Sequence, residues 1–226
     1  MVVRIKAQVL RDAACIISVM FSNLTIVNIS VILFTIFIST ALHEIMHAYV
    51  ALKLGDDLAY SRGRISLNPM SHIDPFLTVG LPLVMLLMGL TPILAAKPVP
   101  ININRVRGHE IGMALIGIAG PLTNLALAIV AGLTLRFIQV DGFLLEFLAT
   151  FFTINIGLFV FNMLPFPPID GSRVLYAFAP EPVQRVMEQV ESFGIIGVII
   201  LVTVLSPVIG PVLDSVRGSL AHLIIG

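Results

Sequence analysis

Long apolar runs, each sufficient to cross a lipid bilayer, restrict the folds open to this chain. Residues 25–54, 110–137 and 143–164 are each apolar over the roughly 20 residues that a transmembrane helix needs. Of the 226 residues, 58% are hydrophobic and 12% are charged, and a soluble domain has about twice that charged fraction. The sequence therefore predicts an all-α polytopic membrane protein.

Four further segments complete the expected fold. Residues 1–22, which carry basic side chains before an apolar stretch and lack a clean cleavage site, should form a retained N-terminal helix. Residues 58–68 alternate in character and predict a strand. Residues 76–96 are apolar but interrupted by prolines and a glycine, as in a re-entrant segment. Residues 193–226 are apolar again, with breaks expected at their two prolines.

Together these segments predict one domain that occupies the whole chain, residues 1–226. We expect about five to six transmembrane helices, a re-entrant segment and a small membrane-associated β-sheet. The core would comprise residues 25–186, preceded by the N-terminal helix and followed by C-terminal helices over residues 183–226.

Charge and cysteine content exclude several classes of partner and site. The 13 Lys and Arg residues balance the 13 Asp and Glu residues, and no basic block stands out, so nucleic acid is not an expected partner. Cys15 is the single cysteine, which excludes an intrachain disulfide and a thiolate metal cluster. The lipid bilayer is the partner that the composition predicts.

A metal-binding pattern, His43-Glu44-Ile45-Met46-His47, lies inside the first apolar run. On a helix this spacing places both imidazoles on one face, where they can bind one zinc ion, and Glu44 can act as general base toward a water on the metal. Ionisable side chains inside a membrane are costly and typically functional. The pattern therefore predicts a hydrolytic zinc site at membrane depth.

A catalytic zinc site needs a third protein ligand, and Asp170 is our choice. It follows the third apolar run directly, in the turn Pro165-Phe166-Pro167-Pro168-Ile169-Asp170-Gly171. Non-helical backbone at membrane depth is tolerated where it lines a cavity. Asp170 could instead cap a helix that begins near Gly171. His72 is expected to be an interfacial histidine without a metal.

Three motifs in order resemble the site-2 protease family of intramembrane zinc metalloproteases. They are H-E-x-x-H at 43–47, G-P-x-x-N at 120–124 and N-x-x-P-x-x-P-x-D-G at 162–171. The resemblance covers roughly residues 35–186 and is nearest to the compact prokaryotic members, which lack appended PDZ or CBS domains. Ser172 stands where the family often has a second glycine.

The resemblance implies a role for each motif residue. His43, His47 and Asp170 would bind one zinc ion per chain. Glu44 would activate the water and then protonate the leaving amine, and Asn162 would stabilise the oxyanion. Asn124 is expected to form hydrogen bonds between helices. The implied activity is peptide-bond hydrolysis within or near transmembrane segments, on single-span membrane-protein substrates.

The zinc site also constrains orientation in the membrane. Two spans separate the histidine motif from Asp170, so residues 76–96 should enter and leave the bilayer on one face if all three ligands are to meet. The basic residues of the connecting segments would then share that face: Lys53, Arg62, Arg64, Lys97, Arg105, Arg107, Arg173 and Arg185. The positive-inside rule therefore predicts a multi-pass protein of the cell membrane with its active site toward the cytoplasm.

Three other interpretations remain open at this point. A transporter or channel with a zinc site would explain the ligands but not Glu44. An inactive relative would be expected to lack the general base. A different H-E-x-x-H protease would take a downstream glutamate as third ligand, and the candidates are Glu146, Glu181, Glu188 and Glu191. The sequence carries no indication of oligomeric state.

Overall fold

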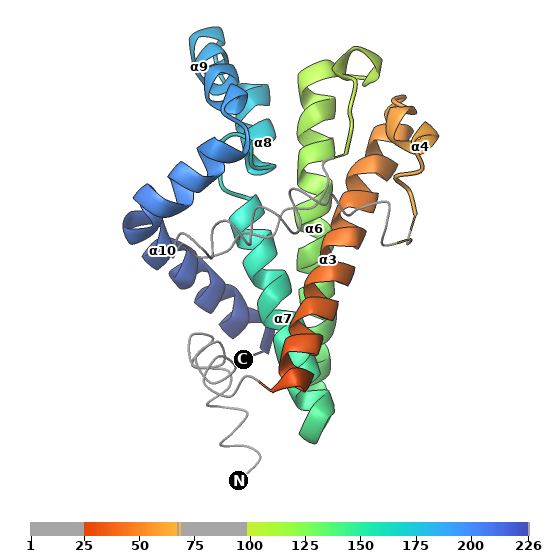
Figure 1. Ribbon diagram of the computed structural model, residues 1–226, viewed down its shortest axis with the longest axis vertical. Helices are drawn as coiled ribbons and strands as arrows, with labels where there is room; N and C mark the ends of the chain where they lie inside the picture. Colours follow the sequence, from red (N-terminus) through yellow and green to blue (C-terminus); the bar gives the residue numbers. More distant parts are fainter. Residues whose placement is uncertain (1–24, 67, 69–98, 226) are drawn as a thin grey trace. The chain divides into compact units, whose positions relative to one another are not determined.

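The computed structural model describes residues 25–66, 68 and 99–225, and this part of the chain is helical with no β-strand (Figure 1). In chain order the elements are α3 (Ile26–Lys53), α4 (Leu58–Ser61), the 3₁₀ helix η3 (Ile103–Arg105), α6 (His109–Phe137), α7 (Gly142–Asn162), α8 (Gly171–Phe178), α9 (Glu181–Ser192) and α10 (Ile195–Ile225).

Three of these helices, α3, α6 and α7, are long and apolar enough to cross a membrane. They coincide with the three apolar runs of the sequence, so the prediction of a mostly helical protein with membrane-length helices is confirmed. Many of their large apolar side chains are exposed, as lipid-facing side chains would be. Examples are Leu33 and Phe34 on α3, Val130 and Phe137 on α6, and Phe143 on α7.

The predicted strand at residues 58–68 is wrong, because the segment begins with helix α4. Asp56 explains the difference: its Oδ1 accepts a hydrogen bond from the backbone N–H of Leu58 at 3.1 Å, which starts a helical turn. Gly63 then has a positive φ of 68°, which is typical of the residue that follows the end of a helix. The small β-sheet is therefore not found within the described residues.

The remaining expectations about the fold have different outcomes. The breaks expected in the last apolar run are wrong, since α10 continues through Pro207 and Pro211. A proline in a membrane helix is tolerated where neighbouring groups satisfy the backbone carbonyl that it frees. The N-terminal helix at 1–22 and the re-entrant segment at 76–96 lie outside the described residues, as does His72.

The chain divides into two compact units. Unit 1 comprises residues 1–39, 121–162 and 207–226. Its described part has an apolar core from α6, α7 and α10, with Phe152, Ile156 and Ala221 among the buried side chains.

Unit 1 also contains a buried hydrogen-bond network between three helices. Asn155 of α7 donates to Ser39 Oγ of α3 at 2.9 Å, and Asn124 of α6 donates to Asn155 Oδ1 at 3.0 Å. All three residues are fully buried. Asn124 therefore forms hydrogen bonds between helices, as expected.

Unit 2 comprises residues 40–120 and 163–206, and its described part contains the H-E-x-x-H motif at residues 43–47 and Asp170. Its small apolar core is formed by Ala51, Val106 and Ile116. Next to this core the carboxylate of Asp56, fully buried, accepts a 2.6 Å hydrogen bond from the backbone N–H of Asn102. The backbone N–H of Arg107 donates to Leu54 O at 2.9 Å. These bonds attach the segment before α6 to the C-terminal end of α3.

Candidate metal centre

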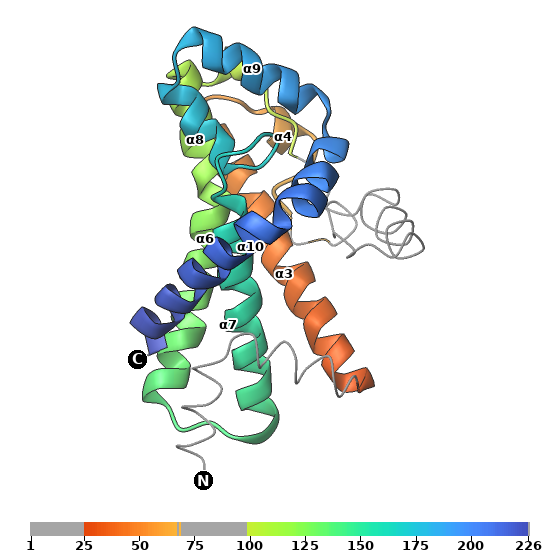
Figure 2. The same cartoon turned by 90° about the vertical axis from the view of Figure 1, so that its left-hand side faces the viewer.

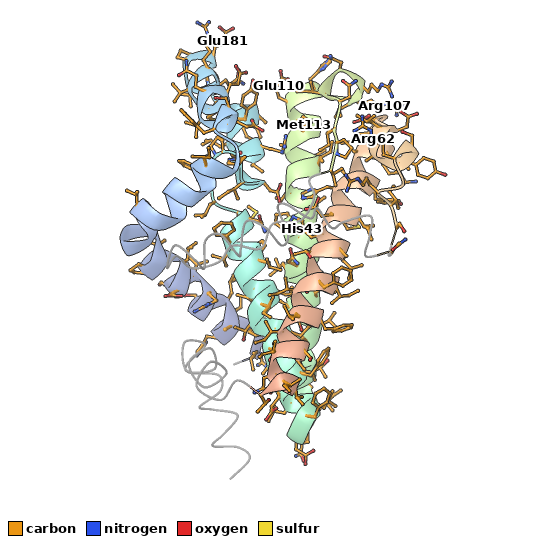
Figure 3. All side chains as sticks on the ribbon, in the orientation of Figure 1. His43, Arg62, Arg107, Glu110, Met113 and Glu181 are labelled. Carbon is orange, nitrogen blue, oxygen red and sulfur yellow. The ribbon has the colours of Figure 1, made fainter. Side chains whose placement is uncertain are left out.

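Helix α3 places His43 and His47 one turn apart on one face, and both are 6% exposed. His43 lies part-way along α3, in the interior of unit 2 (Figure 3). The Nε2 atoms of the two rings are 2.9 Å apart. The helical spacing of the motif therefore directs the same atom of each ring to one point.

A backbone carbonyl of α6 fixes the tautomer of His47. Its Nδ1 lies 2.6 Å from Ile116 O, so Nδ1–H donates to this carbonyl. The lone pair of a neutral imidazole is then on Nε2, which is the atom directed at His43 and Asp170. Metal-binding histidines are commonly oriented in this way by a second hydrogen bond.

Asp170 completes the group from the start of α8. It occupies the N-cap position of that helix, but its side chain makes no capping hydrogen bond. Instead Oδ2 lies 2.9 Å from His43 Nε2 and 3.2 Å from His47 Nε2. The alternative prediction, that the Asp170 side chain caps a helix beginning near Gly171, is therefore wrong.

Two glycines allow the close approach of these groups. A Cβ atom on Gly120 of α6 would lie 2.5 Å from His43 Nε2 and would also collide with His47 Nε2. A Cβ on Gly171 would lie 2.5 Å from Met163 O, so the turn between α7 and α8 can fold back only with glycine here. The backbone of α6 and the proline-rich turn thus form the walls of the site.

The donor set fits a zinc ion. One atom from each of His43, His47 and Asp170 lies within 4.8 Å of the others. In a tetrahedral site with metal–ligand bonds of about 2.0–2.1 Å, ligand atoms lie about 3.3 Å apart. The separations of 2.9, 2.9 and 3.2 Å need to open by only a few tenths of an ångström. Two imidazole nitrogens and one carboxylate oxygen are also the ligand types of known catalytic zinc sites.

The glutamates considered as other third ligands have different contacts. Glu188 accepts a 2.6 Å hydrogen bond from Tyr176, Glu191 lies 4.0 Å from Arg173, and Glu181 pairs with Arg185 at 3.2 Å. Figure 3 shows Glu181 at the far end of α9, away from His43. Among the described residues, the group that could hold a metal with the two histidines contains Asp170 and no glutamate.

The two predicted catalytic side chains have different surroundings. Glu44 follows His43 directly on α3 and is half-buried. Asn162 is the last residue of α7, in unit 1, and its Nδ2 donates to Leu158 O within its own helix at 2.9 Å. Sequence reasoning missed the roles of Ile116 and Asn155. A backbone acceptor leaves no residue-specific signal, and Asn155 belongs to no recognisable motif.

Comparison with known proteins finds relatives that are named as zinc metalloproteases. The sequence model described as peptidase family M50 matches residues 137–205. A Bacillus subtilis (strain 168) protein named "Putative zinc metalloprotease YwhC" is 38% identical over 202 residues, which are 84% of this chain and 88% of that protein. "Putative zinc metalloprotease Rip2" of Mycobacterium tuberculosis (strain ATCC 25618 / H37Rv) is 29% identical over 73% of this chain and 63% of its own. No solved structure gives a significant match. The identity to the Bacillus protein, over most of both chains, shows that this chain belongs to peptidase family M50.

Proposed function

We propose that this chain hydrolyses peptide bonds of membrane-protein substrates, within or near their transmembrane segments, at a zinc ion held by His43, His47 and Asp170. The observation that carries the proposal is the convergence of three ligand atoms within 4.8 Å from two segments far apart in the sequence. Membership of a metallopeptidase family supports a hydrolytic role for this group.

The residues of the site divide the chemistry between them. Zinc, when bound, supplies a Lewis acid that polarises the scissile carbonyl and lowers the pKa of a water. Glu44 accepts the proton of the attacking water and passes it to the leaving amine nitrogen. The Ile116 carbonyl holds His47 in the tautomer that presents Nε2.

Access to the site is uneven among its ligands. The side chain of Asp170 is 20% exposed, whereas those of His43 and His47 are 8% and 7% exposed. Water and an unwound substrate strand would therefore approach on the Asp170 side. Asn162, eight residues before Asp170, is the side chain that we propose to donate a hydrogen bond to the oxyanion of the substrate carbonyl.

A single substitution tests the mechanism. Glu44→Gln removes the base but keeps the size of the side chain, so we expect zinc content to stay at the wild-type level. Cleavage of a model single-span substrate in proteoliposomes should fall by about 10²-fold or more. Glu181→Gln, an exposed change on α9, is the matched control and should cleave normally. Cleavage at the wild-type rate by a folded, zinc-loaded Glu44→Gln protein would refute the mechanism.

A transporter with a zinc site gains no support from the family or the geometry. The same proteoliposomes still test it, since a transporter would move zinc across the membrane regardless of whether position 44 carries a carboxylate.

We further propose that the protein lies in the cell membrane with the metal site toward the cytoplasm. The basic residues Arg62 and Arg107 lie in the segments between α3 and α6, and Figure 3 shows both near the C-terminal end of α3. Clustered Arg and Lys residues favour the cytoplasmic face. Single cysteines at Ser71 and Asn102 in a Cys15→Ser background should both react with an impermeant thiol reagent from the cytoplasmic side. Labelling from opposite sides would contradict the re-entrant segment, and labelling of both positions from the outer side alone would contradict the orientation.

A further inference from the structure

Helix α9 has a polar face that contacts α8. Figures 1 and 2 both show the two helices next to one another. Gln184 Nε2 donates to Tyr176 O at 3.0 Å, and Tyr176 Oη donates to Glu188 Oε1 at 2.6 Å. A longer ion pair of 4.0 Å joins Arg173 to Glu191. The three contacting residues of α9 are spaced by four and three positions, so they lie on one side of the helix.

The opposite side of α9 carries an apolar stripe formed by Val183, Val186, Val190 and Phe193. Val183 is 41% exposed, Val186 57% and Phe193 60%, while Val190 is half-buried. At 3.6 residues per turn, the centre of the stripe lies about 150° around the helix from the centre of the polar face. No residue of the stripe is charged, and Phe178, at the end of α8, is 78% exposed.

Two observations indicate lipid as the occupant of this stripe. A short helix with a strongly polar face, low overall hydrophobicity and an opposing apolar face is the pattern of a helix that lies in a membrane interface. In addition, α9 passes through Phe193 and Gly194 directly into α10, and residues 195–213 of that helix carry no charge. The stripe is thus continuous in the chain with a segment long and apolar enough to enter the bilayer.

A protein partner fits the stripe less well. Four side chains that are about half exposed offer roughly 300 Å², well below the roughly 800 Å² per partner of a standard specific interface. Electrostatic attraction to anionic lipid is also not expected, because α9 carries Glu181, Glu188 and Glu191 against Arg185 alone.

We propose that α9 is an interfacial helix, with Val183, Val186, Val190 and Phe193 at the boundary between lipid headgroups and acyl chains and with its polar face against α8. This contact is with bulk lipid and depends on apolar area, so zwitterionic lipid is sufficient. The proposal goes beyond the hydrolytic activity and does not depend on which bond the site cleaves.

The test uses the full chain in phosphatidylcholine vesicles, in a Cys15→Ser background. Val186→Cys places an environment-sensitive fluorophore on the stripe. Ser192→Cys places the same fluorophore on an exposed polar position of the same helix, about 140° away from the centre of the stripe. We expect the label at 186 to be quenched by brominated acyl chains and protected from aqueous iodide. The label at 192 should show the reverse.

Three results would overturn the proposal. Equal iodide quenching at both positions would place the stripe in water. Protection of position 186 from both iodide and brominated lipid would mean that protein covers it. A requirement for phosphatidylglycerol before any quenching by acyl chains would mean that charge, not apolar area, holds the helix. Each labelled protein is first checked for a wild-type helical spectrum and zinc content, so that a misfolded variant is not scored.

Discussion

Gly120→Ala is the sharpest test of the metal centre, because it adds one carbon atom where the two imidazoles meet. The new Cβ would lie 2.5 Å from His43 Nε2 and 2.7 Å from His43 Cδ2, and it would also collide with His47 Nε2. An ordinary contact is about 3.5 Å or more. Each ring must therefore recede by about 1 Å.

A zinc site cannot keep its coordination geometry when ligands move by that much. Ligand distances in such sites hold to about ±0.2 Å. Loss of a single outer-shell partner already costs about 10–100-fold in metal affinity, and here two ligands move. We expect zinc affinity to fall by at least about 100-fold, equivalent to about 2.7 kcal/mol. Competition with a chromophoric chelator measures this value in detergent-solubilised protein.

Gly157→Ala on α7 is the matched control. Nothing lies within 4 Å of a Cβ at this position, and Gly to Ala inside a helix stabilises it by roughly 1 kcal/mol. The control should therefore keep its zinc affinity and unfold at a slightly higher temperature. If folded Gly120→Ala protein, judged by circular dichroism and gel filtration, binds zinc within threefold of wild type, the described approach of α6 to the histidines is wrong.

Three further outcomes follow from the described contacts. Asp170→Asn should lower zinc content and abolish cleavage, because a carboxamide oxygen is a weaker ligand than a carboxylate. Glu181→Gln should change neither property. Metal analysis of the purified variants measures the zinc content of each. Asn155→Leu should lower the free energy of unfolding by about 1–3 kcal/mol, because it removes the buried hydrogen bonds that Asn155 makes to Asn124 and Ser39; an unchanged unfolding midpoint in detergent would contradict this. The hydrogen bond to Glu188 raises the pKa of Tyr176 to about 12, so its stabilising contribution is complete below the unfolded pKa of about 10 and is lost as the pH rises through the folded value. Tyr176→Phe should remove the part of the tyrosinate absorbance that develops near pH 12. A titration curve that keeps this part would assign it to a residue other than Tyr176.

Much of the site could be predicted because its chemistry is local in the sequence. The four-residue spacing of His43 and His47 fixes their common face on any helix. The prolines before Asp170 exclude helix there, so the sequence already placed an acidic side chain on irregular backbone after a span. The three membrane-length helices followed from apolar length alone.

The remaining features depend on contacts between distant segments. The alternation of residues 58–68 predicted a strand, but the segment begins with helix α4, and the buried carboxylate of Asp56 accepts a hydrogen bond from the backbone N–H of Leu58, the first residue of that helix. The second oxygen of this carboxylate accepts from Asn102, 46 residues away, and no local pattern reveals that partner. The need for glycine at position 120 likewise becomes visible only when the imidazole rings of His43 and His47 are placed against α6.

A zinc ion at the proposed site would also cross-link distant parts of the chain. His43 and Asp170 are 127 positions apart, so an ion held by both closes a loop that includes two of the membrane-length helices, α6 and α7. In a soluble chain, closing a loop of that size stabilises the folded state by up to about 5 kcal/mol. This figure is an upper limit here, because inserted helices already restrict the unfolded chain. Zinc can complete its ligand set only after α7 has been synthesised and inserted. Metal loading would therefore be a late event in biogenesis, and newly made chains would be inactive until all the ligands are in place.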